Sequence, residues 1–413
     1  MRLISDLHIH SRFSRACSKD LTIPNLEKYA KIKGLNLLGT GDFTHPLWIK
    51  ELKNNLEEEG SGVLKTKTGF KFILQTEISL IYSQGGKGRR IHNLILAPNL
   101  EVVSQISEAL GKRGRLDYDG RPIFKIPCPE FVEMMMKISK DVEVIPAHCW
   151  TPWFALFGSN SGFDSLQECF QDQTKNIHAI ETGLSSDPPM NWRLSQLDKM
   201  SVLSFSDSHS FWPWRLGREA TIFDIDLSYK NILKAIRTRE GLSATVEVDP
   251  NFGKYHLTGH RDCNVKLSPK ESLKHKNICP KCGKPLTVGV LQRVEELADR
   301  PEGFKPKDAK PFHSVIPLSE IISTILGKAV SSKAVSESYD KLIKNFGSEF
   351  NILLDVPLDE LRKVVNERLA DAIIRNRNHE ITISAGYDGV YGEPILDNNS
   401  PGVVKKQKSL LEF

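Results

Sequence analysis

The sequence predicts an α/β first half, then a small metal-binding module and a mainly helical C-terminal region. Seven short β-like runs recur through residues 1–210 with helical or loop stretches between them, a pattern typical of βα units around a parallel sheet or barrel. Residues 251–290 are instead rich in Gly, Lys, Pro, His and Cys, and helical periodicity follows. We therefore expect units at residues 1–250, 251–290 and 291–397, and a flexible tail at 398–413.

The expected elements follow from apolar spacing and from residues that end helices. The strand-like runs are Leu3–His8, Leu35–Thr40, Lys71–Glu77, Ile91–Ala97, Val142–Ala147, His178–Glu181 and Ser201–Ser206. Helices are expected at Pro24–Lys33, Pro129–Ser139 and Tyr229–Thr238, and Gly241 ends the last of these. Further along, the pattern predicts helices at 291–300, 317–327, 336–346 and 357–375, a linker at 305–311 and a short strand at 381–384.

Composition narrows the class of protein. The chain has 413 residues, a net charge of +5 and 39% hydrophobic residues, as expected for a globular protein. No apolar run approaches the roughly 20 residues that cross a bilayer, and the segment Met1–His10 lacks the apolar core of a signal peptide. We expect a cytoplasmic monomer without a membrane partner. The seven cysteines are an odd number with one cluster near residues 263–282, which favours metal binding over a disulfide framework.

Potential metal ligands stand at or just after the C-terminal ends of five expected strands. These residues are His8 and His10, Asp42 and His45, Glu77, His148, and Asp207 and His209. Any one histidine could be structural, but loops at this end of an α/β barrel converge on one point. Imidazole and carboxylate groups bind Zn, Mn or Fe, and adjacent divalent ions can promote phosphate ester hydrolysis. The pattern predicts a metal-dependent phosphoesterase in which Glu77, His148 and Asp207 are catalytic and Glu77 bridges two ions.

Six motifs together resemble the PHP domain of the polymerase and histidinol phosphatase superfamily. They are HIH at 8–10, GTGDFTHP at 39–46, the glutamate of TEIS at 77, HNLILAP at 92–98, PAHCW at 146–150 and SDSH at 206–209. The resemblance spans about residues 1–245. It implies a distorted seven-stranded β/α barrel with a trinuclear metal site, and it implies that His8, His10, Glu77, His148, Asp207 and His209 are ligands.

The chain departs from the PHP pattern at a few positions. Asp42 stands where many members have a histidine, so a carboxylate is expected to replace that ligand. His45 is then either a substitute ligand or a residue that supports the ligands. Ser14 and Arg15 follow the first motif where a further histidine is common, so the third ion is expected to bind more weakly or only with substrate. His92 matches a recurrent position and can be a ligand or a structural residue.

Two short hooks in residues 251–290 have the spacing of a zinc site. His260-Arg-Asp-Cys263 and Cys279-Pro-Lys-Cys282 each offer two ligands for one tetrahedral structural zinc. His256 and His275 remain alternatives to His260 as the fourth ligand. The surrounding Lys and Arg residues, with Arg261 foremost, make the module either a nucleic-acid contact or a structural element alone.

The order of a PHP barrel, a zinc hook pair and a helical C-terminal region resembles the endonuclease Q family over the whole chain. That resemblance implies a DNA repair endonuclease that cuts 5′ to deaminated bases (hypoxanthine, uracil or xanthine) or abasic sites. It implies two or three divalent ions, with Zn expected and Mg or Mn as alternatives, besides the structural zinc. Aromatic and basic residues after the ligand motifs are expected to contact DNA, because aromatic rings stack on extruded or unstacked bases. The expected contacts are Trp150, Trp153, Phe211, Trp212, Trp214, Arg215, Arg218 and Arg261.

The tail and two rival functions complete the expectations. Gln407, Leu410 and Phe413 resemble the motif that docks on the DNA sliding clamp (PCNA), although its second aromatic is missing. One rival is a PHP-type small-molecule phosphatase acting on a histidinol-phosphate-like substrate. The other is an inactive, metal-stabilised DNA-binding scaffold. The basic C-terminal region favours the nuclease over the phosphatase, and the near-complete ligand set favours it over the scaffold.

Overall fold

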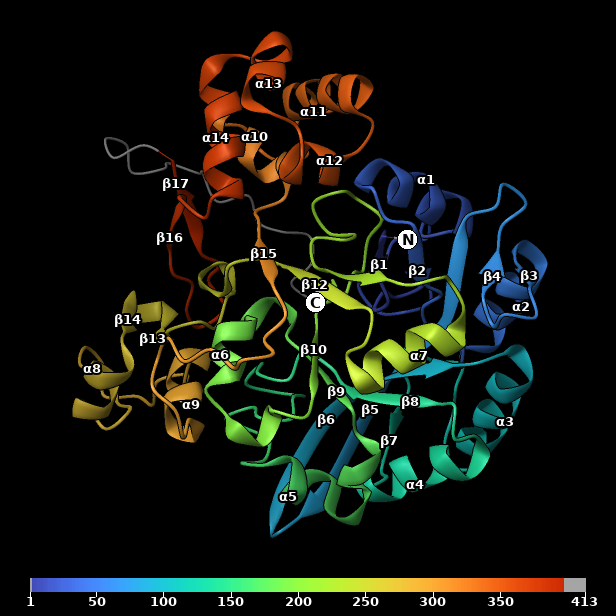
Figure 1. Cartoon of the computed structure of the whole chain (residues 1–413). Helices are drawn as coiled ribbons and strands as arrows, with labels where there is room; N and C mark the ends of the chain where they lie inside the picture. The colour runs from blue at the N-terminus through green and yellow to red at the C-terminus, as the bar shows by residue number, and fades with distance from the viewer. Residues whose placement is uncertain (1, 397–413) are drawn as a thin grey trace.

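The computed structural model describes residues 2–396 and shows a mixed α/β fold (Figure 1). Its main sheet has eleven strands in the order β15-β12-β11-β1-β2-β5-β4-β3, while β6 pairs with β5 and β8, and β7 pairs with β5. These strands are β1 (Arg2–Asp6), β2 (Leu37–Gly39), β3 (Glu57–Glu58), β4 (Leu64–Lys65), β5 (Lys71–Gln84), β6 (Lys87–Ala97), β7 (Ile123–Phe124), β8 (Glu143–Pro146), β11 (Ala220–Asp224), β12 (Leu242–Glu247) and β15 (Phe312–Ser314). The expected clamp motif at 407–413 lies outside the described residues.

Strand direction differs from the expected parallel arrangement. The pairs β1–β2 and β2–β5 are parallel, but β5–β6 and β6–β8 are antiparallel. The reversal occurs at Gly85 and Gly86, which both have positive φ and make a two-residue turn too short for a crossover helix. The expectation of a wholly parallel sheet is therefore wrong at β6. All seven expected runs do contain strands, and β9 (Ala179–Glu181) and β10 (Ser201–Leu203) form a separate parallel pair.

Hydrogen bonds beyond the strand ends bring these runs together. Cys149 N, after β8, donates to Glu181 O at the end of β9 at 3.0 Å. A parallel bridge joins Ile9, after β1, to Ser208, after β10, and His10 N donates to Ser208 O at 2.9 Å. The C-terminal ends of β1, β8, β9 and β10 therefore lie beside one another.

Helices cover the sheet through amphipathic faces (Figure 1). Helix α7, for example, buries Ile232 and Ile236 in one apolar cluster with Leu3 and Leu37 of the sheet. The three helices expected in the first 250 residues are present, whereas the strands β11 and β12 on either side of α7 were not expected. The helices of this part are α1 (Ile23–Lys33), α2 (Pro46–Asn55), α3 (Leu100–Gly111), α4 (Cys128–Ile138), α5 (Leu166–Phe170), α6 (Pro188–Trp192) and α7 (Tyr229–Thr238), with 3-10 turns at η1 (Gln171–Asn176), η2 (Gly183–Ser185), η3 (Ser195–Leu197) and η4 (Pro250–Phe252).

Five C-terminal helices form a layer at the top of Figure 1. They are α10 (Leu318–Leu326), α11 (Lys333–Phe346), α12 (Glu349–Leu354), α13 (Leu358–Val364) and α14 (Glu367–Arg377). The structure has two helices, α13 and α14, where one helix was expected at 357–375. The Asn366 side chain accepts from Leu369 N at 2.9 Å and caps the N-terminus of α14, so a new helix begins there. Within residues 2–396, no helix has both the length and the apolar character needed to cross a membrane.

Residues 382–395 pack against the cysteine-containing segment. It comprises β13 (Thr258–His260), η5 (Arg261–Cys263), β14 (Val265–Leu267), α8 (Pro269–Lys274) and the following α9 (Val290–Leu297). The hairpin of β16 (Thr382–Ser384) and β17 (Glu393–Ile395) returns to this segment, where Tyr387 OH donates to Asn264 Oδ1 and Thr287 Oγ1 donates to Asp388 Oδ1, both at 2.6 Å. The C-terminal region is therefore joined to the cysteine segment as well as to the main sheet.

Candidate metal centre

Four predicted ligands converge just beyond the ends of β1 and β10 and on β5. His8, His10, Glu77 and Asp207 each place one ligand atom within 4.8 Å of the others. His10 Nε2 lies 3.1 Å from Glu77 Oε2 and 3.1 Å from Asp207 Oδ1, and His8 Nε2 lies 3.6 Å from the same two oxygens. Two ligands bound at about 2.1 Å to a tetrahedral ion would lie roughly 3.4 Å apart. The spacing therefore fits one divalent ion.

The hydrogen bonding of His8 agrees with a role as ligand. Its Nδ1 lies 2.8 and 3.0 Å from the two carboxylate oxygens of Glu181, while its buried Nε2 has no hydrogen-bond partner among the described residues. A carboxylate at Nδ1 keeps the proton there and leaves the Nε2 lone pair free for a metal. Glu181 was not predicted as a site residue, although it ends an expected strand just as the predicted ligands do. It also accepts from His148 N at 2.7 Å.

A second group shares Glu77 with the first. His92 Nδ1 and His148 Nε2 lie 2.7 and 3.2 Å from Glu77 Oε1, whereas Oε2 faces the first group. His92 reaches this point because β6 runs antiparallel to β5 and pairs His92 with Ser79. Burial opposes the charge of Glu77, but neighbouring His92 and Arg121 hold its pKa well below the usual range. One ionised carboxylate thus points one oxygen at each group, as a ligand bridging two ions would.

Asp42 contacts a predicted ligand and lies outside both groups. Its Oδ1 lies 3.0 Å from His10 Nδ1, and its Oδ2 accepts from Ser11 N at 2.6 Å and from Ser14 Oγ at 2.9 Å. The structure therefore places Asp42 behind His10, as Glu181 lies behind His8. The sequence could not distinguish these roles, because both put a carboxylate at a strand end.

The two remaining predicted histidines lie outside both groups in the described part of the chain. The His209 ring is centred 4.3 Å from that of His10, and its Nδ1 lies 3.1 Å from the backbone oxygen of Asp207. His45 stacks on Phe13 with ring centres 4.4 Å apart. His209 is thus adjacent to the predicted ligand His10, whereas His45 packs against an aromatic side chain.

Three site residues have an unusual backbone conformation. Asp42, His148 and Asp207 have φ values of 37°, 31° and 47°, which residues other than glycine rarely adopt. Such strain persists only where surrounding contacts enforce it, and it is concentrated at functional sites. Its occurrence at three neighbouring predicted residues supports a functional centre here.

Arg121 is a site residue whose position the sequence did not specify. Its Nη1 donates to Glu77 Oε2 at 2.9 Å, and 26% of its side chain is exposed. In the sequence it belongs to a basic stretch with Lys112, Arg113 and Arg115, so its charge could be read only as part of a surface run. In the structure it is the cation next to the shared carboxylate.

The two cysteine hooks also meet. His260, Cys263, Cys279 and Cys282 place their ligand atoms within 4.8 Å of one another, with His260 Nδ1 3.4 Å from Cys282 Sγ. Gly283, with a φ of 73°, allows the turn in which its N–H donates to Cys279 O at 2.9 Å. His256 and His275 lie outside this group, so His260 is the histidine that the structure brings to the three sulfurs.

The chain is similar to known proteins over part or all of its length. A family model described as the MJ0043 C-terminal domain matches residues 317–380. The crystal structure of the lesion-specific endonuclease PfuEndoQ from Pyrococcus furiosus is 36% identical, covers 95% of each chain and has a TM-score of 0.86. The chain belongs to the endonuclease Q family. A second endonuclease Q structure, in complex with a 27-mer duplex substrate with an abasic lesion at the active site, is 35% identical over 100% of each chain with a TM-score of 0.87.

Outside the solved structures of the endonuclease Q family, a relative is found in Methanocaldococcus jannaschii. The uncharacterized protein MJ0043 is 36% identical over 252 residues, which make up 60% of this chain. The matched part spans only 31% of the length of that relative.

The aromatic residues of this endonuclease Q family member differ in exposure. Trp150 is fully buried and its Nε1 donates to Asn191 Oδ1 at 2.8 Å, so the expectation that it lies exposed to DNA is wrong. Trp212, by contrast, is 43% exposed and stacks on Trp214 with ring centres 5.3 Å apart. The sequence could not separate them, because both follow a ligand motif on a loop.

The other predicted DNA contacts vary in the same way. Phe211 is buried against Tyr29 at 4.9 Å, and Trp153 packs edge-on to Tyr255 at 5.6 Å. Arg218 Nη2 donates to Ser206 O at 3.0 Å. Arg215 is partly buried and Arg261 is exposed. Among the predicted DNA contacts, Trp212 and Arg261 are therefore the two exposed side chains.

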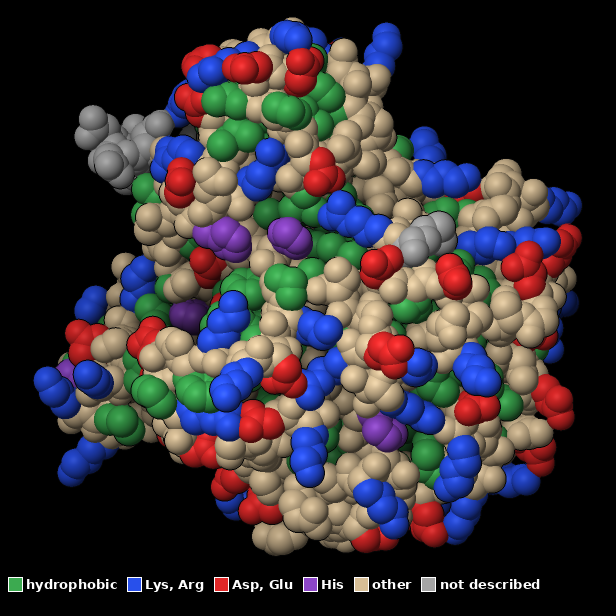
Figure 2. All heavy atoms as spheres, in the orientation of Figure 1, with side chains coloured by type: hydrophobic (Ala, Val, Ile, Leu, Met, Phe, Trp, Pro, Cys, Tyr) green, Lys and Arg blue, Asp and Glu red, His purple; other side chains and the backbone are tan. Residues whose placement is uncertain are grey.

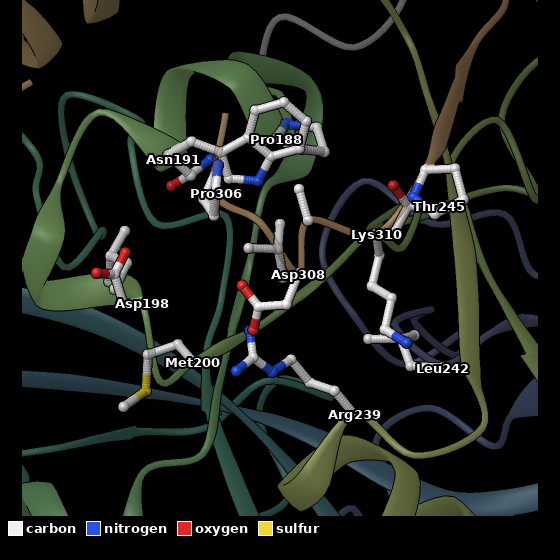
Figure 3. Close-up of a pocket in the computed structure, with 15 residues that line it drawn as sticks. Pro188, Asn191, Asp198, Met200, Arg239, Leu242, Thr245, Pro306, Asp308 and Lys310 are labelled. Carbon is white, nitrogen blue, oxygen red and sulfur yellow. The ribbon is translucent and has the colours of Figure 1, made fainter. Parts of the chain in front are cut away.

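A pocket away from the candidate metal centre lies between β10, β12 and residues 306–311 (Figure 3). Arg239 and Asp308 face each other in it with a 2.8 Å ion pair. All of its lining residues lie outside the three candidate ligand groups. In this endonuclease Q family member it is thus separate from the candidate metal centre.

Proposed function

We propose that this protein is a DNA repair endonuclease that hydrolyses the phosphodiester 5′ to an abasic site or a deaminated base, namely hypoxanthine, uracil or xanthine. The main support is the carboxylate of Glu77, which is shared between two groups of potential ligands. The whole-chain similarity to a lesion-specific endonuclease, and to one in complex with abasic duplex, supports DNA as the substrate. A centre for two adjacent ions in such a chain fits phosphodiester hydrolysis.

We further propose that β1, β2, β5, β6, β8, β9 and β10 form a distorted seven-stranded barrel within residues 1–250. The hydrogen bonds from Cys149 to Glu181 and from His10 to Ser208 support closure where no strand ladder is present in the described residues. Residues 251–290 would hold one structural zinc through His260 and the three cysteines, and residues 291–397 would form the helical domain.

Each ion would have its own ligand set. His8, His10 and Asp207 would hold one ion with Glu77, and His92 and His148 would hold a second with the same carboxylate. A third, weaker ion would lie near His209. When bound, such ions (Zn, with Mg or Mn as alternatives) polarise a phosphoryl oxygen and lower the pKa of water.

The protein's own groups would prepare this chemistry. Glu181 and Asp42 fix the ring orientation of His8 and His10. Arg121 uses one N–H on Glu77 and has further N–H groups at its partly exposed end, which we propose bind the scissile phosphate. The exposed Trp212 and its partner Trp214 offer a flat surface on which bases of an unstacked strand can stack. Unstacking is easier at a damaged base, which pairs less well than a normal one.

One face of the molecule carries charges of both signs. On the face shown in Figure 2, Lys and Arg side chains are interspersed with Asp and Glu. The net charge of +5 is therefore not gathered into one basic patch on that face.

The decisive experiment uses labelled duplexes with one abasic site, deoxyinosine, deoxyuridine or deoxyxanthosine, and an undamaged control. Chelator-treated protein is assayed with and without Mg²⁺, Mn²⁺ or Zn²⁺. We expect metal-dependent incision 5′ to each lesion, leaving a 3′-hydroxyl and a 5′-phosphate, and loss of incision in Glu77→Gln. Hydrolysis of histidinol phosphate without nicking would instead identify a small-molecule phosphatase. DNA binding without turnover of any substrate would identify an inactive scaffold.

The tail carries a separate proposal. We propose that Gln407, Leu410 and Phe413 dock on the DNA sliding clamp, as one helical turn placing Leu410 and Phe413 in an apolar pocket. Deletion of residues 407–413 should abolish binding to the clamp in a pull-down with purified proteins and leave incision of free duplex unchanged. Equal clamp binding with and without the tail would refute the proposal.

A further inference from the structure

A buried ion pair joins the first half of the chain to the C-terminal helices. Lys33 Nζ, at the end of α1, lies 2.7 Å from Glu349 Oε1 in the first turn of α12, and their side chains are 1% and 0% exposed. A buried ion pair often contributes no more stability than apolar residues of similar volume, because both charges lose their hydration. We therefore look to its specific geometry, not to stability, for the role of this pair.

Lys33 also contacts the loop that follows the predicted ligands Asp207 and His209. Its Nζ donates to Pro213 O at 2.8 Å. In the sequence, Pro213 separates Trp212 from Trp214, and the rings of these two tryptophans stack on each other. At the end of this loop, a Cβ on Gly217 would come within 3.0 Å of Lys33 Cγ, so the loop backbone packs directly on the lysine. The loop, residues 210–217, begins immediately after His209.

Glu349, on α12, in turn accepts hydrogen bonds from two other C-terminal helices. Besides Lys33 it accepts from Leu318 N at the start of α10 at 3.0 Å and from Tyr339 OH of α11 at 2.8 Å. Glu349 itself starts α12. Every oxygen of this carboxylate is therefore engaged, and the position of Lys33 depends on how these helices pack.

We propose that Lys33 and Glu349 are positioning residues through which the C-terminal helices fix loop 210–217, and with it the Trp212–Trp214 stack, relative to the candidate metal centre. The inference rests on the proposed function in taking DNA as the ligand of that stack. The pair would set how firmly the DNA strand is held, and it would leave the hydrolytic step unchanged, because neither residue contacts the candidate ligands.

The test removes both charges together in Lys33→Met/Glu349→Gln, so that no unpaired charge is buried. Tyr339→Phe is a milder variant that removes one hydrogen bond to Glu349. Glu143→Gln is the matched control, because Glu143 pairs with Arg237 in the buried interior outside this network. Three assays are run on each variant: hydrogen exchange of the amides of 210–217, steady-state kinetics on abasic duplex for KM and kcat, and hydrolysis of bis(4-nitrophenyl) phosphate.

We expect faster exchange in 210–217 and a rise in KM of about tenfold for the double variant, with a smaller rise for Tyr339→Phe. Both kcat and hydrolysis of the small diester should stay within about twofold of the parent. In a Trp212→Ala background the effect on KM should largely disappear, since the pair acts through the stack.

Two results would overturn the inference. One is unchanged exchange in 210–217 in both variants. The other is a parallel fall in duplex incision and small-diester hydrolysis, which would mean a general loss of structure. If the parent protein cleaves neither substrate, the proposed function fails, while the exchange measurement still decides whether the pair holds the loop.

Discussion

The substitution Glu181→Gln tests the candidate metal centre from behind its ligands. The carboxylate of Glu181 is fully buried and receives His8 Nδ1 on both oxygens and His148 N on one. Glutamine offers one acceptor oxygen, so it can satisfy either His8 or His148 N and must turn an N–H toward the other donor. The unsatisfied buried donor costs about 1–3 kcal/mol of folding stability.

The effect on metal binding follows from the orientation of His8. Without a carboxylate at Nδ1, the ring loses both its fixed tautomer and part of its basicity at Nε2. Replacing such a partner typically weakens metal affinity about 10–100-fold, or roughly 1.4–2.7 kcal/mol. We expect apparent dissociation constants to rise by that factor in a competition titration with a chromogenic chelator, and incision to recover at saturating metal.

Glu143→Gln provides a matched control. Glu143 is also buried, and it holds His178 Nδ1 at 2.9 Å and Arg237 Nε at 2.7 Å, but it lies outside the candidate ligand groups. This variant should lose stability without losing metal. Metal affinity of Glu181→Gln within about twofold of the parent would refute the role assigned to Glu181, as would an equal loss of metal in both variants.

Three further substitutions address other parts of the molecule. Arg121→Met should lower incision about 10–100-fold while metal affinity stays equal or increases, because a cation beside Glu77 is removed; metal lost in step with activity would contradict this. Cys279→Ser should reduce the zinc content by about one ion per chain and speed hydrogen exchange in residues 258–286, with metal binding at the candidate centre retained; an unchanged zinc content would argue against a zinc site at the two cysteine hooks. Burial raises the pKa of Glu247 from 4.5 to about 8, so the folded state keeps a proton that the unfolded state releases, and the free energy of unfolding should fall as the pH rises from 4.5 to 8. In urea titrations at pH 5, 6.5 and 8, Glu247→Gln should show a shallower fall than the parent, and parallel curves would exclude Glu247 as the cause.

The positions that the sequence identified best are those where strand ends converge. His8, His10, Glu77, His148 and Asp207 were expected together because each was read as ending a strand or following one, and the structure places all of them within the two candidate groups. Glu77 is the exception to the reasoning, because β5 continues past it to Gln84. That reasoning depends only on strand periodicity and on which end of a strand carries its loop.

The sequence does not show which side chains line the candidate centre and which lie behind them. Asp42, which was itself expected to be a ligand, and Glu181 differ from the residues of the two candidate groups only in what lies in front of them, and no spacing rule encodes that. Similarly, Trp150 and Trp212 both follow ligand motifs, yet only the first finds a buried acceptor in Asn191. The reversal at β6 was missed because it depends on two glycines whose turn replaced a crossover.

The pairing of Lys33 with Glu349 also has a consequence for the order in which the protein matures on the ribosome. The two residues are 316 positions apart in the chain. At about 5–20 residues per second, roughly 15–60 s separate the appearance of the lysine from that of its partner. During that interval the N-terminal strands and the candidate ligands can assemble, but Lys33 must stay hydrated. Nascent chains halted before residue 349 should therefore show a protease-sensitive segment at 210–217 that becomes resistant once the C-terminal helices have been made.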